Sequence, residues 1–146
     1  MKIENSLIEN YNYMSCIFCE IIKGNVPCYK VYEDETCLAF LDIRPASQGH
    51  TLVLPKEHWE NFEAIDNETL SKVMVVVKKI GQAIKAGLGV EGYNIVVNNN
   101  AVAGQIVPHL HFHIIPRKSG DGLEPWPQGE YKTGEAEEIL EKIKIG

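Results

Sequence analysis

Apolar residues recur at helical spacing through one long stretch of the chain, residues 67–89. The periodic apolar positions are Leu70, Val73, Met74, Val77, Ile80 and Ile84. Most of the lysines in this stretch fall on other faces of the helix that this spacing describes. Asp66 or Asn67 is suited to cap the start, and Gly87 or Gly89 the end. The pattern predicts one long amphipathic helix with a buried face.

Five shorter segments have the alternating or continuous apolar character of strands. They lie at residues 29–33, 37–42, 50–55, 93–98 and 109–115. Only a few turn-forming residues join the first three, which favours antiparallel pairing of successive strands over parallel crossover units. Short helices are predicted at residues 19–24 and 135–145. The chain is therefore predicted to be α+β, with five short strands, one long helix and short helices.

The organisation along the chain predicts one folded domain. The domain is expected over residues 15–117, which hold all five strand segments and the long helix. Residues 1–14 are predicted to be an N-terminal extension. Residues 118–146 form a tail that is rich in glycine and proline until its short helix.

The composition and charge of the chain limit the kinds of partner that the protein is expected to bind. The 146 residues are 45% apolar, enough for one domain with a core. Their net charge of −6 has the wrong sign for binding long nucleic acids through their phosphates, although small anionic ligands remain compatible. The N-terminus has no apolar run of about seven or more residues, so we expect neither a signal peptide nor a membrane anchor. A cytoplasmic protein is predicted, and its four cysteines are expected to be reduced thiols or metal ligands.

Histidine occupies every second position from 109 to 113, within the segment PHLHFHIIPR at residues 108–117. Because side chains alternate in a strand, the three imidazoles share one face, while Leu110, Phe112 and Ile114 take the other. A buried imidazole left without hydrogen-bond partners costs about 1–3 kcal/mol. Such a row is therefore expected in a site that supplies partners.

Two kinds of site are compatible with this row: a metal cluster, or a histidine nucleophile flanked by histidines that orient it. At roughly 3.3 Å per residue the first and third imidazoles lie about 13 Å apart, too far to share one ion easily. Residues 102–116 also contain no acidic ligand. These points argue against a metal site built from all three histidines. A neutral imidazole, by contrast, is a competent nucleophile near pH 7.

The alternating histidines resemble the motif of the histidine triad superfamily. The resemblance extends to CIFCEIIKGNVPCYKVYEDETCLAFLDIRPASQGHTLVLPKEH (16–58) and GYNIVVNNNAVAGQIVPH (92–109), and it covers about residues 15–117. These segments look like the nucleotide-binding branch of the superfamily. The resemblance implies a homodimer that joins two five-stranded antiparallel sheets into one of ten strands. It also implies attack on the α-phosphorus of a nucleoside phosphate derivative.

The resemblance assigns catalytic roles to three histidines by position. His111, the middle histidine, is expected to attack phosphorus and form a nucleotidyl-histidine that water then cleaves. His113 is expected to help hold the phosphate or the leaving group. His50, in QGHTLVLPK, matches the additional histidine near the α-phosphate.

The same resemblance assigns nucleotide-binding residues. Asp42 is expected to accept hydrogen bonds from the ribose hydroxyls, which suits a carboxylate. Asn98 and Gln105 match positions that contact the phosphate or the leaving group. Gly104 lets backbone N–H groups approach an oxyanion closely. The chain departs from the family at Ile106, where Ser or Thr commonly supplies a hydroxyl, and this departure puts the leaving-group preference and the rate in question.

A metal site is predicted beside the histidine row. Alone, the Cys16–Cys19 pair is a weak signal that is also compatible with unliganded thiols or a redox pair. The resemblance to zinc-containing relatives adds His58 and His109, which completes a structural zinc site with four protein ligands. His109 would then be unavailable for catalysis.

The sequence as a whole predicts a nucleotide hydrolase or transferase that binds a purine nucleotide and cleaves a phosphoramidate or related bond. Three alternatives remain open: a diadenosine polyphosphate hydrolase, a nucleotide-binding regulatory module with little turnover, and a zinc-dependent hydrolase. Trp126 is compatible with closing over the site of a partner subunit or with packing a loop.

Overall fold

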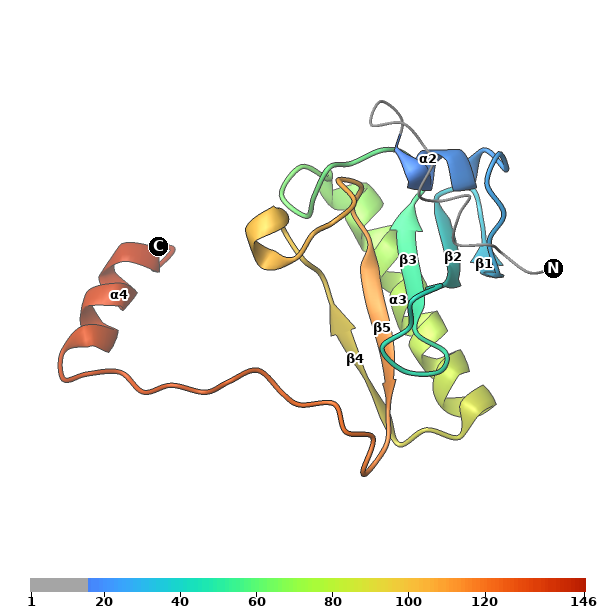
Figure 1. The fold of residues 1–146 in the computed structure, drawn as a ribbon. Coiled ribbons are helices and arrows are strands. Elements are labelled where there is room, and N and C mark those ends of the chain that lie inside the picture. The colour runs from blue at the N-terminus through green and yellow to red at the C-terminus, as the bar shows by residue number, and fades with distance from the viewer. Residues whose placement is uncertain (1–15) are drawn as a thin grey trace.

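A computed structural model describes residues 16–146, and the predicted extension at residues 1–14 lies outside the described residues. The core of the fold is one antiparallel sheet in the order β1-β2-β3-β5-β4 (Figure 1). Its strands are β1 (Lys30–Glu33), β2 (Cys37–Leu41), β3 (Thr51–Pro55), β4 (Gly92–Val96) and β5 (Phe112–Arg117). The predicted α+β class with a five-stranded antiparallel sheet is confirmed.

The helices are α2 (Ile17–Ile22), α3 (Asn67–Leu88) and α4 (Glu135–Ile143), with a 3-10 turn η1 at Ala101–Ala103. The long helix predicted from residues 67–89 is α3. Asp66 caps it by accepting a hydrogen bond from the Thr69 backbone N–H at 2.8 Å. Gly89 ends it in the left-handed conformation (φ 63°), which glycine adopts without steric cost.

Two apolar clusters lie on opposite faces of the sheet. On one face, the buried side of α3 packs against Leu110, Phe112 and Ile114. On the other face, α2 contributes Phe18 and Ile21 to a cluster with side chains of β2 and β3. Leu110, Phe112 and Ile114 therefore face α3, as the alternating pattern predicts, and the histidines between them face the side of α2.

The strand predicted at residues 109–115 begins later than expected, at Phe112. Pairing between β3 and β5 stops at Val53 and Phe112, two residues before β3 ends at Pro55. Pro55 has no N–H to donate to a neighbouring strand, and its carbonyl accepts from Nε2 of the His109 side chain at 2.8 Å. The Leu110 N–H donates to the Trp59 carbonyl at 2.6 Å. Before Phe112, side-chain and loop contacts thus replace the backbone pairing between β3 and β5. The side chains of residues 109–115 still alternate between the two faces of the sheet.

The tail leaves the domain as an extended segment that ends in α4 (Figure 1). Its short helix was predicted at residues 135–145 and is observed at Glu135–Ile143. Among the described residues, none of the helices combines the length and the apolar character needed to span a bilayer.

Candidate active site

A cavity of about 290 Å³ opens on the sheet face that carries the histidines. Its polar lining is Asp42, Arg44, His111 and His113, together with the backbone at Gly104. Its apolar lining is Ile17, Phe18, Ile21, Ile43, Leu52, Ile106 and Val107. The cavity thus joins two triad histidines and the predicted ribose acceptor Asp42 to an apolar wall from α2 and β3.

The tautomer of His111 is fixed by the backbone. Its Nδ1 lies 2.8 Å from the carbonyl oxygen of His109, and a carbonyl can only accept. Nδ1 therefore carries the proton, and Nε2 keeps its lone pair. The ring packs edge-on against Phe18 with the ring centroids 5.0 Å apart, which holds its orientation.

His113 has the opposite tautomer because of a relay that starts at a backbone amide. The Ala46 N–H donates to Nδ1 of His50 at 3.0 Å, so in the neutral ring of His50 the proton is on Nε2. That N–H donates to Nδ1 of His113 at 2.9 Å. Nε2 of His113 therefore carries a proton and is a donor. The two cavity histidines thus differ: His111 offers a lone pair, and His113 offers an N–H.

Burial keeps these imidazoles neutral. It lowers the pKa of His111, which is only 8% exposed. Burial, with the nearby His111 and His50 rings, lowers the pKa of His113 to about 4. Burial also lowers the pKa of His50, against an opposing effect of Asp42. At neutral pH the site therefore contains uncharged rings whose proton positions are set by hydrogen bonds.

Asp42 lies directly after β2, in the lining of the cavity. Its Oδ1 accepts from the Arg44 backbone N–H at 2.8 Å, which closes a tight turn. Its Oδ2 lies 3.7 Å from Nε2 of His50. The turn fixes the carboxylate in the cavity lining, and its predicted contact with ribose hydroxyls stays a prediction.

The loop after β4 is held by Gln105, whose side chain is buried. Its Nε2 donates to the carbonyls of Glu60 (2.6 Å) and Val107 (3.1 Å). Its Oε1 accepts from the Asn100 N–H at 2.8 Å. Asn100 itself has φ 70°, unusual for a residue with a side chain. Gln105 therefore positions the loop, and its predicted contact with phosphate stays a prediction.

The glycine of this loop lies in the cavity wall. Gly104 has φ 95° and lines the cavity. Asn98 lies behind it, with Nδ2 3.5 Å from the Gly104 carbonyl oxygen. The structure thus brings Gly104 to the site directly, whereas Asn98 lies beside the cavity lining.

Two residues that contact the site histidines were not identified from the sequence. Phe18 orients His111, and Ala46 sets the tautomer of His50 through its backbone N–H. Phe18 lies in the CIFC motif, in which the sequence pattern indicates a role for the two cysteines only. No sequence signal marks Ala46, because its contribution is a backbone group.

A second cluster lies next to the first triad histidine. Cys16, Cys19, His58 and His109 place their ligand atoms within 4.8 Å of one another. The Sγ–Nδ1 distances are 3.5 Å for Cys16–His109, 3.3 Å for Cys19–His58 and 3.6 Å for Cys19–His109. The four residues predicted as metal ligands are therefore brought together by the fold.

The spacing of this cluster fits a tetrahedral zinc ion. Zinc bonds of about 2.3 Å to sulfur and 2.1 Å to nitrogen put tetrahedral ligand atoms about 3.6 Å apart. Nε2 of His109 donates to the Pro55 carbonyl at 2.8 Å, which leaves its Nδ1 lone pair directed at the cysteines. Burial and the neighbouring Cys16 raise the pKa of the Cys19 thiol to about 11.

The chain is similar in sequence to known proteins of one family. The sequence matches the HIT domain family over residues 23–120. It is 53% identical over 129 residues to an uncharacterized HIT-like protein of Methanocaldococcus jannaschii, covering 88% of this chain and 98% of that protein. It is 45% identical over 137 residues to a protein of Schizosaccharomyces pombe named adenosine 5′-monophosphoramidase, covering 90% of this chain and 100% of that protein.

One solved structure with a similar fold is of a zinc-bound protein. The crystal structure of a zinc-bound histidine triad family protein from Mycobacterium smegmatis aligns with a TM-score of 0.73 and 42% sequence identity. The alignment covers 77% of this chain and 82% of that one.

Proposed function

The chain belongs to the HIT domain family, and from that membership we propose that it is a nucleotide hydrolase or transferase acting at the α-phosphorus of purine nucleoside monophosphate derivatives. Phosphoramidates are the proposed substrate class. The observation that carries the proposal is the opposite tautomers of His111 and His113 on one cavity wall. The similarity to a relative named adenosine 5′-monophosphoramidase supports this choice of substrate.

The proposed reaction is a double displacement at phosphorus. The Nε2 lone pair of His111 bonds to phosphorus, and the bond to the leaving group breaks with its electron pair going to the leaving group. Water supplies the proton that the leaving group takes up. A second water then attacks the nucleotidyl-histidine and gives its proton to the hydroxide that the first water became, while the N–P bond breaks and its electron pair returns to Nε2 of His111. The N–H of His113 donates to the phosphoryl oxygen or the leaving group throughout.

The apolar part of the cavity is suited to the base and sugar. Phe18, Ile43 and Leu52 line it and offer flat or branched surfaces on which a purine can lie. Asp42 is proposed to accept from the ribose hydroxyls in the cavity. Contacts of Asn98 and Gln105 with the phosphate are part of the same proposal.

The decisive test is His111→Ala with adenosine 5′-phosphoramidate as substrate. Removing the nucleophile is expected to lower kcat/KM at least about 1,000-fold, while AMP binding measured by calorimetry changes little. Rapid quenching of the wild type should also yield a nucleotidyl adduct on the peptide that contains His111. A variant with more than a tenth of wild-type turnover would reject the nucleophile.

The same assay separates the alternatives. Faster cleavage of a diadenosine polyphosphate than of the phosphoramidate would favour the dinucleotide hydrolase. Tight AMP binding with no turnover of either substrate would favour a regulatory module. Loss of turnover on chelation, with the fold intact, would favour a zinc-dependent hydrolase.

We further propose that Cys16, Cys19, His58 and His109 bind zinc. With four protein ligands the ion would have a structural role, joining the N-terminal helix and the segment after β3 to the start of the triad. A cytoplasmic location is proposed as well, since reduced thiols persist there.

A homodimer is the proposed assembly. Among residues 16–146, β4 pairs with β5 on one side and with no strand on the other. A second copy placed edge to edge against β4 would extend the sheet to ten strands.

A further inference from the structure

We propose that Ser47 is a positioning residue that determines which ring nitrogen of His113 carries the proton. Its hydroxyl holds the β2–β3 loop, residues 42–50, on β5, and the backbone of that loop sets the tautomer of His50. The inference rests on the proposed function, in which the N–H at Nε2 of His113 donates to a phosphoryl oxygen or to the leaving group.

The pair of His50 and His113 can exist in two neutral states. In the first state, Nε2 of His50 donates to Nδ1 of His113, and Nε2 of His113 carries a proton. In the second state, Nδ1 of His113 donates to Nε2 of His50, and Nε2 of His113 has only a lone pair. The hydrogen bond between the rings, 2.9 Å long, exists in both states and does not select one of them.

Two groups of the β2–β3 loop select the first state. The Ala46 N–H lies 3.0 Å from Nδ1 of His50 and needs a lone pair there. In the second state this nitrogen would carry a proton, and two donors would face each other. The Asp42 carboxylate also favours a proton on Nε2 of His50, because its Oδ2 lies 3.7 Å from that atom. The tautomer of His113 therefore depends on the position of this loop.

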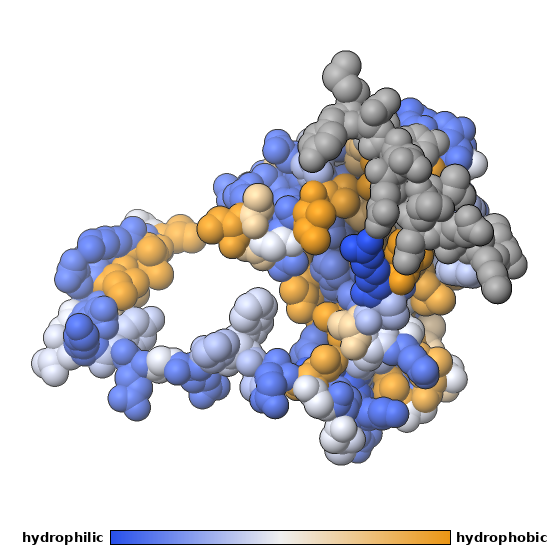
Figure 2. All heavy atoms as spheres, in the orientation of Figure 1, coloured by the Kyte–Doolittle hydropathy of each residue, from blue (hydrophilic) through white to orange (hydrophobic). Residues whose placement is uncertain are grey.

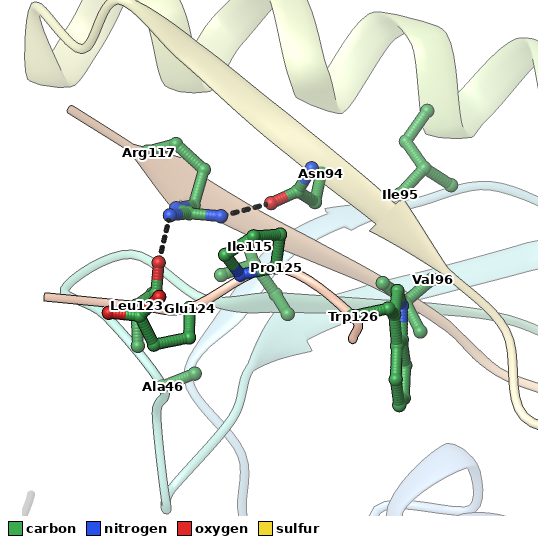
Figure 3. A pocket seen from close by; sticks show the side chains of 10 residues that line it. All are labelled: Ala46, Asn94, Ile95, Val96, Ile115, Arg117, Leu123, Glu124, Pro125 and Trp126. Carbon is green, nitrogen blue, oxygen red and sulfur yellow. Dashed lines mark hydrogen bonds between the residues drawn. The ribbon is translucent and has the colours of Figure 1, made fainter. Parts of the chain in front are cut away.

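Packing alone does not fix the part of the loop that carries Ala46. Figure 2 shows the β2–β3 loop at the surface of the molecule, and residues 44–46 and 48 are exposed. Ala46 also lines a cavity of about 420 Å³, together with Ile115 of β5 (Figure 3). Atoms that border an open space have few partners to attract them. Hydrogen bonds are therefore needed to hold Ala46 in place.

Ser47 supplies such a bond between the loop and the sheet. Its Oγ donates to the Pro116 carbonyl at 2.7 Å, and Pro116 lies three residues after His113 on β5. The Ser47 carbonyl accepts from the His50 N–H at 3.0 Å. Ser47 thus joins the strand of His113 to the backbone of His50, directly beside the amide of Ala46.

A second contact of the loop does not replace this bond. Gly49 has φ 91° and lies so close to Leu88 of α3 that a Cβ would not fit between them. This contact fixes the chain next to His50, but three residues away from Ala46. Ser47 is adjacent to Ala46, so its hydroxyl is the group that controls the position of the Ala46 N–H.

Long-range ¹H–¹⁵N correlation spectra of the histidine rings at pH 7 test the proposal without an assay of activity. These spectra distinguish a ring nitrogen that carries a proton from one that does not. In the wild type we expect protons on Nε2 of His50 and His113. In Ser47→Ala we expect part of the population to carry them on Nδ1 of both rings. Unchanged proton positions in this variant, or a wild type that is already in the second state, would overturn the proposal.

Turnover of adenosine 5′-phosphoramidate measures the consequence for the reaction. Ser47→Ala is expected to lower kcat/KM about three- to tenfold, the effect of one hydrogen bond. Ser47→Thr keeps the hydroxyl and should restore the wild-type spectrum and at least about half of the wild-type kcat/KM. Ser71→Ala is the control, because it removes a hydroxyl that donates to a carbonyl at 2.8 Å on α3, outside the cavity lining. It should change kcat/KM less than twofold.

The two measurements together separate positioning from a general effect on stability. Lower activity in Ser47→Ala with unchanged tautomers would show that Ser47 only stabilises the fold, and it would overturn the positioning role. A wild type that cleaves no nucleotide derivative would reject the proposed function, and the spectra would still decide whether Ser47 sets the proton of His113.

Discussion

At the scale of single residues, the chemistry depends on hydrogen bonds to backbone groups. His111 and His113 are identical side chains two positions apart, yet the His109 carbonyl places the proton of one ring on Nδ1. The Ala46 N–H, acting through His50, places the proton of the other on Nε2. A ring nitrogen with a free lone pair and an N–H donor thus arise from one residue type.

Ile106 offers a test of leaving-group recognition at this scale. Its side chain is 92% exposed and lines the cavity, at the position where the family resemblance led us to expect the hydroxyl of Ser or Thr. In Ile106→Ser, a new hydrogen bond of about 0.5–1.5 kcal/mol to a polar leaving group is expected to raise kcat/KM for adenosine 5′-phosphoramidate about three- to tenfold.

The matched control is Val102→Ser, which adds the same hydroxyl in the same loop at a side chain that is 98% exposed. It should leave kcat/KM within a factor of two. Equal effects of the two substitutions would show that the hydroxyl acts through the loop in general and not on the leaving group.

At the scale of elements, the metal-ligand cluster connects three separate segments. Cys16 and Cys19 belong to the start of α2, His58 follows β3, and His109 precedes β5. Since the β3–β5 ladder ends at Val53 and Phe112, these contacts act together with the bonds to the Pro55 and Trp59 carbonyls to hold the start of the triad. A metal here would stabilise the wall of the cavity without touching the substrate.

Cys19→Ser tests the cluster. Wild-type protein purified with zinc is expected to contain about one equivalent of metal by mass spectrometry. The variant should lose the metal, and its Tm should fall by about 5–10 °C, because structural metal binding contributes to the free energy of folding.

Cys28→Ser is the control, because Cys28 is a half-buried cysteine outside the cluster. It should keep the metal. A wild type that binds no zinc under these conditions would contradict the site, and a Cys16–Cys19 disulfide in the isolated protein would favour the redox alternative.

At the scale of the whole molecule, the neutral histidines couple folding to pH. The pKa of His113 is about 4 in the folded protein and about 6.5 in an unfolded chain. Below pH 6.5 the unfolded state therefore binds more protons, so stability is lost as the pH falls from about 6.5 towards 4.

We expect the free energy of unfolding to fall by about 2 kcal/mol more in the wild type than in His113→Asn between pH 7 and pH 4.5. Urea unfolding of the metal-free proteins measures this difference, since loss of metal at low pH then makes no contribution. An identical pH dependence in the two proteins would show that His113 has the same pKa in the folded and the unfolded state.

The sequence by itself determined the elements and the faces that they present. The period of the apolar residues located α3, and the alternation from His109 to Phe112 placed imidazoles and hydrocarbon on opposite faces. These features follow from local geometry, because the direction of a side chain depends on its own helix or strand. Resemblance to a family supplied the expected roles, including His58 and His109 as the metal ligands that complete the Cys16–Cys19 pair.

Only the tertiary structure decided the start of β5 and the tautomers of His50 and His113. Each depends on groups that are distant in the chain: His113 meets His50 across 63 positions, and His109 meets Cys16 across 93. Ala46 acts through a backbone N–H that every residue except proline has, so no side-chain pattern marks it. Proton positions and long-range contacts are set when the sheet closes, and the local sequence does not encode them separately.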